Sequence, residues 1–203
     1  MKMKSVRGTE TKLKMIQVAA DLFHKQGVVA TSPEEIIDAS GTGKGQFYHY
    51  FKSKEGLIHE VLQTHLEAIT TGTARMDYNV ESWEHLERWF LAHLELQKAF
   101  QMRRGCPFGT VGNEITEKDE LIRQDLNLIF EVVKNKLVTF FVQEKAHRRL
   151  QKDVNVDQMA DFCIATIQGA MLMGKIKQSS RPVETTIREA LSHLKRYVAI
   201  PKR

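Results

Sequence analysis

The side chains best able to do chemistry lie on one short segment near the N-terminus. Within seven positions it carries an ammonium group, an amide, an imidazole and two phenols: Lys44, Gln46, Tyr48, His49 and Tyr50. Ammonium groups neutralise phosphates, and amide groups can pair with adenine in the major groove. Gly43 and Gly45 would let the backbone approach phosphate oxygens closely. This set of residues therefore predicts contact with double-stranded DNA.

Two short helices must position these side chains. Ser32 can cap the first helix, and Glu35 three residues later can close a capping box. Gly41 ends that helix, because glycine takes the left-handed conformation without a steric clash. Thr42 is then expected to cap a third helix at about residues 43–50. The pattern predicts a helix-turn-helix, whose second helix lies in the major groove.

Apolar spacing in this region predicts a small helical core. Phe47 and Phe51 are four residues apart, so they share one face of the third helix. The expected buried positions of the preceding helix are Ile36, Ile37 and Ala39. A first amphipathic helix, ending at Gly27, is predicted from apolar residues at steps of three and four: Leu13, Ile16, Ala20 and Phe23.

The segment GTGKG at residues 41–45 must also be weighed as a nucleotide-binding loop. A P-loop needs a glycine where Asp38 stands and a serine or threonine where Gly45 stands, and it follows a strand. A helix is expected here instead, so we reject this interpretation. An ordinary helical pair within a bundle is the remaining alternative to DNA binding.

Charge and composition support a DNA-binding N-terminal part. The chain has 203 residues and a net charge of +5; residues 1–54 hold nine Lys/Arg against five Asp/Glu, and the rest hold 21 against 20. Mild basicity alone would also suit a solvated or membrane-facing surface. Cys106 and Cys163 are too few for a disulfide framework and are not spaced as metal ligands. With no signal core and no membrane-length apolar run, we expect a cytoplasmic protein without cofactor or metal.

Residues 9–62 resemble the DNA-binding domain of TetR-type transcriptional regulators. The resemblance rests on residues in the family's order: Gly41, Lys44, Gly45, Phe47, Tyr48, Tyr50, Phe51, Ser53, Lys54, Glu55 and Leu57. Two departures are Ser40 in place of the usual alanine and Thr42-Gly43 in place of Val-Ser. Gly43 removes a common contact to the DNA backbone. The resemblance implies a helix-turn-helix domain at 1–54 and a helical effector-binding and dimerisation domain at 55–203.

Helical periodicity continues through the second domain, and no strand pattern is present. With the first three helices, the whole chain is predicted to be all-α with about nine helices. The expected later helices run over about 54–70, 81–100, 107–114, 122–145, 156–178 and 182–199.

The last two predicted helices could pair two subunits. Gly169, Ala170 and Gly174 would allow close helix approach, although the same helices could simply complete a monomer's core. The resemblance implies a homodimer through residues 156–178 and 182–199. Two recognition helices about 34 Å apart would then reach successive major grooves of a palindromic operator.

Side-chain chemistry assigns different DNA contacts to different residues. Phosphate contacts are expected from Thr42, Lys44, Tyr48 and Lys54, and base contacts from Gln46, Tyr50 and His49. Ser32 and Gly45 complete the predicted DNA-binding set.

Apolar residues of the second domain could line a pocket for a small effector. The candidates are Trp89, Phe90, His93, Cys106, Phe108, Phe130, Cys163 and Met171, which could equally be ordinary core. Cys106 lies between Arg104 and Pro107, where positive charge and a helix start favour the reactive thiolate. TetR-type regulators with a Gly-Cys step at this place include members that respond to electrophiles or oxidants through that thiol. The alternative is a small residue packed at a tight elbow.

Two rival functions differ from an effector-responsive repressor. An enzyme could use Cys106 as nucleophile and His93 as base, but no third orienting group is recognisable, so we expect no catalytic residues. A purely architectural DNA binder would not need the large second domain. The preferred hypothesis is a repressor that leaves its operator when a small molecule or a thiol-reactive compound binds.

Overall fold

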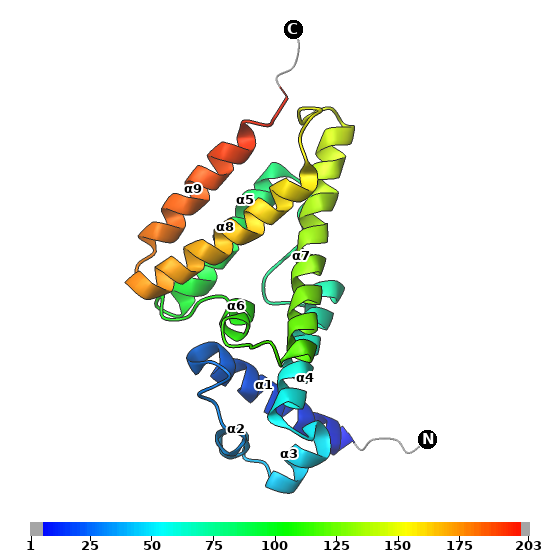
Figure 1. Cartoon of the computed structure of the whole chain (residues 1–203), viewed down its shortest axis with the longest axis vertical. Helices are drawn as coiled ribbons and strands as arrows, with labels where there is room; N and C mark the ends of the chain where they lie inside the picture. The colour runs from blue at the N-terminus through cyan, green and yellow to red at the C-terminus, as the bar shows by residue number, and fades with distance from the viewer. Residues whose placement is uncertain (1–5, 200–203) are drawn as a thin grey trace. The chain divides into compact units, whose positions relative to one another are not determined.

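The computed structural model describes residues 6–199, and their regular structure is helical (Figure 1). Within this range the all-α prediction is confirmed, with a single isolated bridge between Leu150 and Val198. The helices in chain order are α1 (Val6–Gln26), α2 (Pro33–Ser40), α3 (Lys44–Phe51), α4 (Lys54–Thr71), α5 (Trp83–Ala99), α6 (Pro107–Gly112), α7 (Glu120–Ala146), α8 (Val156–Lys177) and α9 (Arg181–Lys195). None of the described helices is both long and apolar enough to cross a bilayer.

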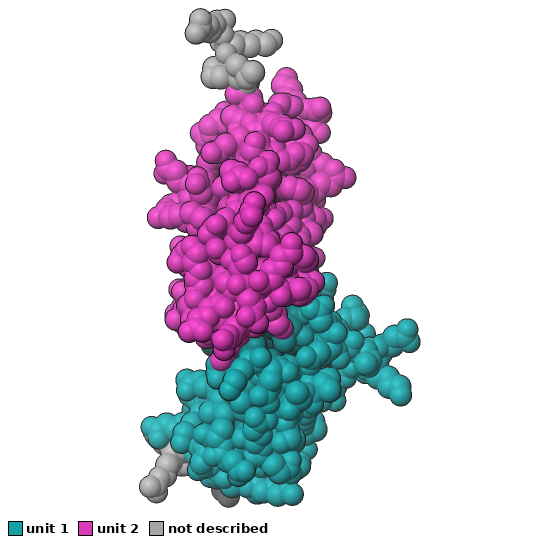
Figure 2. Space-filling view, turned by 90° about the vertical axis from the view of Figure 1, so that its left-hand side faces the viewer, with its two compact units in different colours: residues 1–67, 107–129 teal, residues 68–106, 130–203 magenta. Residues whose placement is uncertain are grey.

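The chain divides into two compact units (Figure 2). The first contains residues 1–67 and 107–129, and the second contains residues 68–106 and 130–203. The first unit extends beyond the predicted domain at 1–54, because it includes most of α4, the short α6 and the start of α7. Segments distant in sequence therefore support the helix-turn-helix.

Capping side chains set the start of several helices, as predicted. Ser32 Oγ accepts a hydrogen bond from Glu35 N at 3.1 Å, and Gly41 ends α2 with a φ of 62°. The Glu35 side chain does not close the predicted capping box: its carboxylate accepts hydrogen bonds from Gln26 Nε2 at 3.1 and 2.9 Å, so it ties α2 to α1 instead. Asn155 caps α8 by accepting from Gln158 N at 3.1 Å.

The core of the first unit differs from prediction at two positions. Leu13 is 45% exposed, whereas Met15 and Ala19 are fully buried, because Leu13 lies on the flank of the buried stripe of α1. On α2, Ala39 is exposed and Ser40 is buried, because Ser40 lies between Ile36 and Ile37 on the helix surface.

Helices α5, α8 and α9 pack together in the second unit. A Cβ added to Gly174 would lie 2.7 Å from Val183 Cγ2, so glycine allows α8 and α9 to approach closely within one chain. A Cβ added to Gly169 would have no neighbour within 4 Å. Of the residues predicted to allow close helix approach, Gly174 therefore lies at a helix contact within the chain, whereas Gly169 has open space beside it.

Candidate DNA-binding site and effector-domain residues

Helix α3, the predicted recognition helix, has one buried face and one exposed face. Phe47 is fully buried and Phe51 is 3% exposed, and their rings meet edge to face at 5.5 Å between centroids. Tyr48 is 41% exposed. The side chains of Lys44, Gln46 and His49 are also exposed, and Tyr50 is half-buried. Because Phe47 and Phe51 are buried, the side chains of Lys44, Gln46, Tyr48 and His49 lie on the solvent-exposed face of α3.

The start of α3 corrects the predicted cap. The helix begins at Lys44 and its N-cap is Gly43, whose N–H donates to Gln46 Oε1 at 2.9 Å. Thr42 was expected to cap this helix, but its hydroxyl lies 2.7 Å from Ser40 Oγ. The Gln46 side chain reaches back one turn and accepts from the backbone N–H of the N-cap Gly43, as the N3 residue of a capping box does.

Among the predicted DNA-binding residues, Lys44, Gly45 and Ser32 are exposed, whereas Lys54 is half-buried. Lys44 Nζ lies 3.8 Å from Glu34 Oε1, with 69% and 63% of the two side chains exposed. Such a surface pair contributes little to stability and is screened by salt. Lys54 Nζ lies 3.5 Å from Val29 O, and a Cβ added to Gly45 would meet nothing within 4 Å. Ser32 is exposed at the start of α2. Each can therefore face a polyanion.

The predicted effector residues fall into both compact units. Trp89, Phe90 and His93 are buried on α5, and Cys163 and Met171 are buried on α8. Phe130 is half-buried on α7. Phe108 belongs to the first unit, where its ring contacts His65 at 5.4 Å between centroids.

His93 is a neutral, hydrogen-bonded core residue in this structure. Burial lowers its pKa to about 4, against the opposing effect of its hydrogen bond to Trp89. Its Nδ1 lies 2.8 Å from Trp89 O, so Nδ1 carries the proton. Trp89 Nε1 is buried and has no hydrogen-bond partner among residues 6–199.

Gln97 is a buried polar residue whose role the sequence did not indicate. It follows Trp89 and His93 at steps of four on the buried face of α5, so helical periodicity is consistent with a core position but says nothing of its hydrogen bonds. Its Nε2 donates to Arg104 O at 3.0 Å and to Met171 O at 2.8 Å. Gln97 thereby joins α5 to α8 and to the segment before α6.

The two cysteines differ in environment. Cys163 is fully buried, and burial raises the pKa of its thiol to about 12. Cys106 is 9% exposed and directly precedes α6. Burial raises the pKa of Tyr78, and the nearby Cys106 contributes to this increase. The Arg104 guanidinium lies 4.3 Å from the Phe100 ring centroid.

A buried carboxylate in the first unit was also not predicted. Asp125 on α7 has a side chain 7% exposed, and it accepts from Gln63 Nε2 at 2.7 Å. Its other oxygen lies 2.7 Å from His59 Nδ1. These contacts join α4 to α7. Over residues 6–199 no cluster of three His, Cys, Asp or Glu side chains has the arrangement of a metal site.

Comparison with known families accounts for most of the chain. Residues 15–61 match the bacterial regulatory proteins of the tetR family, and residues 72–190 match the tetracyclin repressor-like C-terminal domain. The HTH-type transcriptional repressor DhaR of Mycobacterium sp. (strain GP1) is 27% identical over 188 residues, covering 90% of this chain and 93% of that protein. The HTH-type transcriptional repressor KstR2 of Rhodococcus jostii (strain RHA1) is 41% identical over 64 residues, or 32% of this chain and 29% of that protein.

Solved structures share the same fold. A TetR transcriptional regulator from Chloroflexus aurantiacus J-10-FL has a TM-score of 0.80 at 20% identity, covering 96% of this chain and 99% of that chain. The reduced form of E. coli NemR has a TM-score of 0.76 at 22% identity, covering 95% and 100%. Since the C-terminal family match spans more than half of the sequence and the N-terminal match contains α2 and α3, this chain belongs to the TetR family of DNA-binding transcriptional regulators.

Proposed function

We propose that this TetR-family regulator is a homodimeric cytoplasmic repressor that binds a palindromic operator and leaves it when a small molecule binds the second unit. It acts by binding and catalyses no reaction. The observation that carries the proposal is the division of α3 into a buried face, Phe47 and Phe51, and an exposed face bearing Lys44, Gln46 and Tyr48. Exposed base-reading and phosphate-binding groups on a rigid helix suit the major groove.

Subunit pairing is supported by the outer face of α8. Leu172, Met173 and Ile176 are 47%, 41% and 65% exposed, although they are large apolar residues. Gly169, on the same helix, has open space beside it. A second copy of this helix would cover these apolar side chains and approach closely at the glycine.

The proposal is tested by selecting genomic DNA fragments with the purified protein and footprinting those that are retained. We expect protection of two inverted half-sites about 34 Å apart, one per subunit. Retention of no fragment above a random-sequence background, or protection of a single half-site by a monomer, would contradict it.

For the signal, we propose a small, largely apolar effector, with modification of the Cys106 thiol as the second candidate. Support for the thiol comes from its place directly before α6 and from a structural relative that was solved in a reduced form. The test compares operator release by N-ethylmaleimide in the wild type, Cys106→Ser and Cys163→Ser. Thiol sensing predicts release in the wild type and in Cys163→Ser only; equal release in all three removes Cys106 from the mechanism.

A further inference from the structure

The turn between α1 and α2 is held mainly by residues of the helix-turn-helix itself. Gly27 leaves α1 with a φ of +89°, a conformation that favours glycine. The hydroxyl of the buried Thr31 donates to Gly27 O at 2.7 Å. Gln26 Nε2 donates to Ala30 O at 3.3 Å, and Lys54 Nζ lies 3.5 Å from Val29 O. These contacts fix the geometry with which the chain enters α2.

One further contact comes from a distant part of the sequence. Glu114 Oε2 accepts a hydrogen bond from Val29 N at 2.7 Å. A Cβ added to Gly27 would lie 1.9 Å from Glu114 Oε1 and 2.7 Å from its Cδ. The carboxylate therefore occupies the space that any side chain at position 27 would fill. Glu114 thereby joins this turn to a segment beyond residue 67, whereas Gln26, Thr31 and Lys54 belong to the helix-turn-helix region itself.

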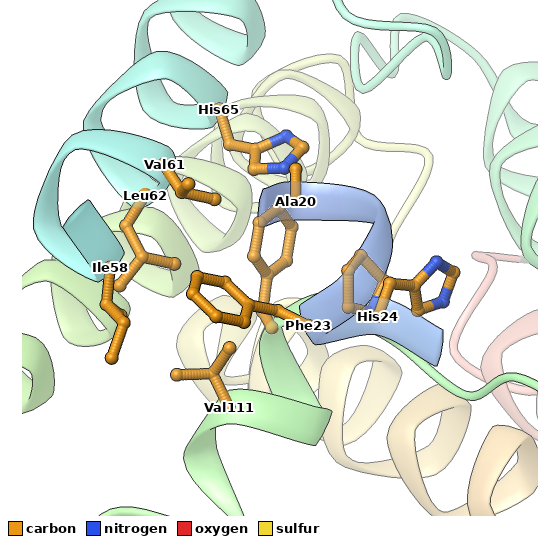
Figure 3. A pocket seen from close by; sticks show the side chains of 10 residues that line it. Ala20, Phe23, His24, Ile58, Val61, Leu62, His65 and Val111 are labelled. Atoms are coloured by element: carbon orange, nitrogen blue, oxygen red, sulfur yellow. The ribbon is translucent and has the colours of Figure 1, made fainter. Parts of the chain in front are cut away.

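Helix α6 determines where the Glu114 carboxylate lies. Glu114 N donates to Val111 O at 3.0 Å, so Glu114 continues directly from the end of α6. Val111, Phe23 of α1 and Leu62 of α4 line the same void, which is only about 10 Å³ (Figure 3). Close-packed side chains transmit displacement, so a shift of α6 would carry Glu114 with it.

The electrostatics of this contact favour a reversible role. A carboxylate at the C-terminal end of α1 meets the negative end of the helix dipole, which is the less favourable location for an anion. Its hydrogen bond to Val29 N offsets that cost. Glu114 is therefore held by a short contact that has no additional support from the helix dipole.

We propose that Glu114 is a positioning residue that holds the turn between α1 and α2 in its DNA-binding geometry, so that α6 controls α2 and α3 through this carboxylate. The inference rests on the proposed operator-binding function. It adds to that function a defined contact through which the helix following Cys106 acts on the DNA-binding helices.

The test measures binding of the selected operator and of random-sequence DNA by fluorescence anisotropy. Glu114→Ala should weaken operator binding about ten-fold, the effect of losing one charge-assisted hydrogen bond, while random-sequence binding changes less than about two-fold. Glu114→Gln keeps the size and an acceptor oxygen, so it should bind within about two-fold of the wild type. Glu117→Ala, an exposed neighbour, is the matched control.

A double-mutant cycle separates positioning from a general loss of stability. Gly27→Ala should expel the carboxylate, so the double variant with Glu114→Ala should bind no more weakly than the weaker single variant. Because Gly27→Ala also strains the backbone, hydrogen exchange of the Val29 amide in Glu114→Ala and Glu114→Gln gives a second measurement. Hydrogen exchange of the Val29 amide should be faster than in the wild type in Glu114→Ala but not in Glu114→Gln.

Three distinct outcomes overturn the inference. If the wild type selects an operator and Glu114→Ala binds it equally well, only the positioning role is lost. If the wild type selects no operator, the proposed function fails and the inference falls with it. Equal losses of operator and random-sequence affinity, together with a lower melting temperature, would identify a purely structural residue.

Discussion

At the residue scale, the exposed face of α3 contains side chains with few competing partners. Lys44 has one ion pair, with Glu34 at 3.8 Å, and both groups are well exposed. Exchanging that carboxylate for a phosphate costs little, because surface pairs contribute about 1 kcal/mol or less. Lys44 is therefore suited to sequence-independent affinity, whereas the amide of Gln46 is suited to base recognition.

Replacing Lys44 by alanine should weaken binding to all DNA sequences and reduce the slope of log affinity against log salt by about one. The physical reason is that one fewer phosphate is neutralised, so fewer counterions are released. Titrations at several salt concentrations measure this, with Lys118→Ala as an exposed control. Unchanged affinity and slope would exclude Lys44 from the interface.

Acidification should destabilise the second unit through His93. Its folded pKa of about 4 lies below the ordinary value of 6.5, so the unfolded chain binds the additional proton between these pH values. The contribution of neutral His93 is complete above about pH 6.5 and is lost as pH falls toward 4, amounting to about 2 kcal/mol between pH 7 and pH 5. Urea unfolding at both pH values should show a smaller pH dependence in His93→Gln. An equal dependence in both proteins would mean that His93 titrates normally.

At the element scale, local signals predicted the helices, but contacts between helices could not be predicted. The caps Ser32, Gly41 and Asn155 act within a few residues, so the bounds of α2 and α8 follow from sequence. The predicted start of α3 was one residue too early, because the N-cap is Gly43, whose N–H donates to the Gln46 side chain. Asp125 and Glu114 acquire their partners only through the packing of distant helices, which one sequence does not specify. The proposed DNA and effector contacts remain predictions.

Gln97 should be essential to the packing of α5 on α8. Replacing it by leucine removes the hydrogen bonds that Gln97 Nε2 donates to the carbonyls of Arg104 and Met171, which should lower the free energy of unfolding by about 2 kcal/mol. Removing the unpaired Gln97 Oε1 offsets part of that loss. Denaturant unfolding measures the change, and the exposed Lys98→Ala should stay within about 0.5 kcal/mol of the wild type. If Gln97→Leu has the same free energy of unfolding as the wild type, Gln97 is not needed for the packing of α5 on α8.

At the scale of the whole molecule, the proposed operator binding requires two copies acting together. Ile176→Lys places a charge on the exposed apolar face of α8, and it should convert the dimer to monomers and weaken operator binding. Light scattering after size-exclusion chromatography measures the mass. Val142→Lys is the matched control, because Val142 is 48% exposed on α7. A dimeric Ile176→Lys protein would place the subunit interface elsewhere.

The hydrogen bond between Gly43 N–H and Gln46 Oε1 has a consequence for sequence discrimination. If Gln46 pairs with an adenine through both its amide oxygen and its amide nitrogen, its side chain swings away from the start of α3 and the hydrogen bond from Gly43 N–H breaks. The Gly43 N–H then needs a new acceptor, such as a phosphate oxygen. In the proposed complex, base recognition by Gln46 and anchoring of the Gly43 N–H would therefore occur together, once in each half of the palindrome. A base pair that cannot replace the lost hydrogen bond would be disfavoured in both halves, so modest selectivity at one half-site would be squared across the pair.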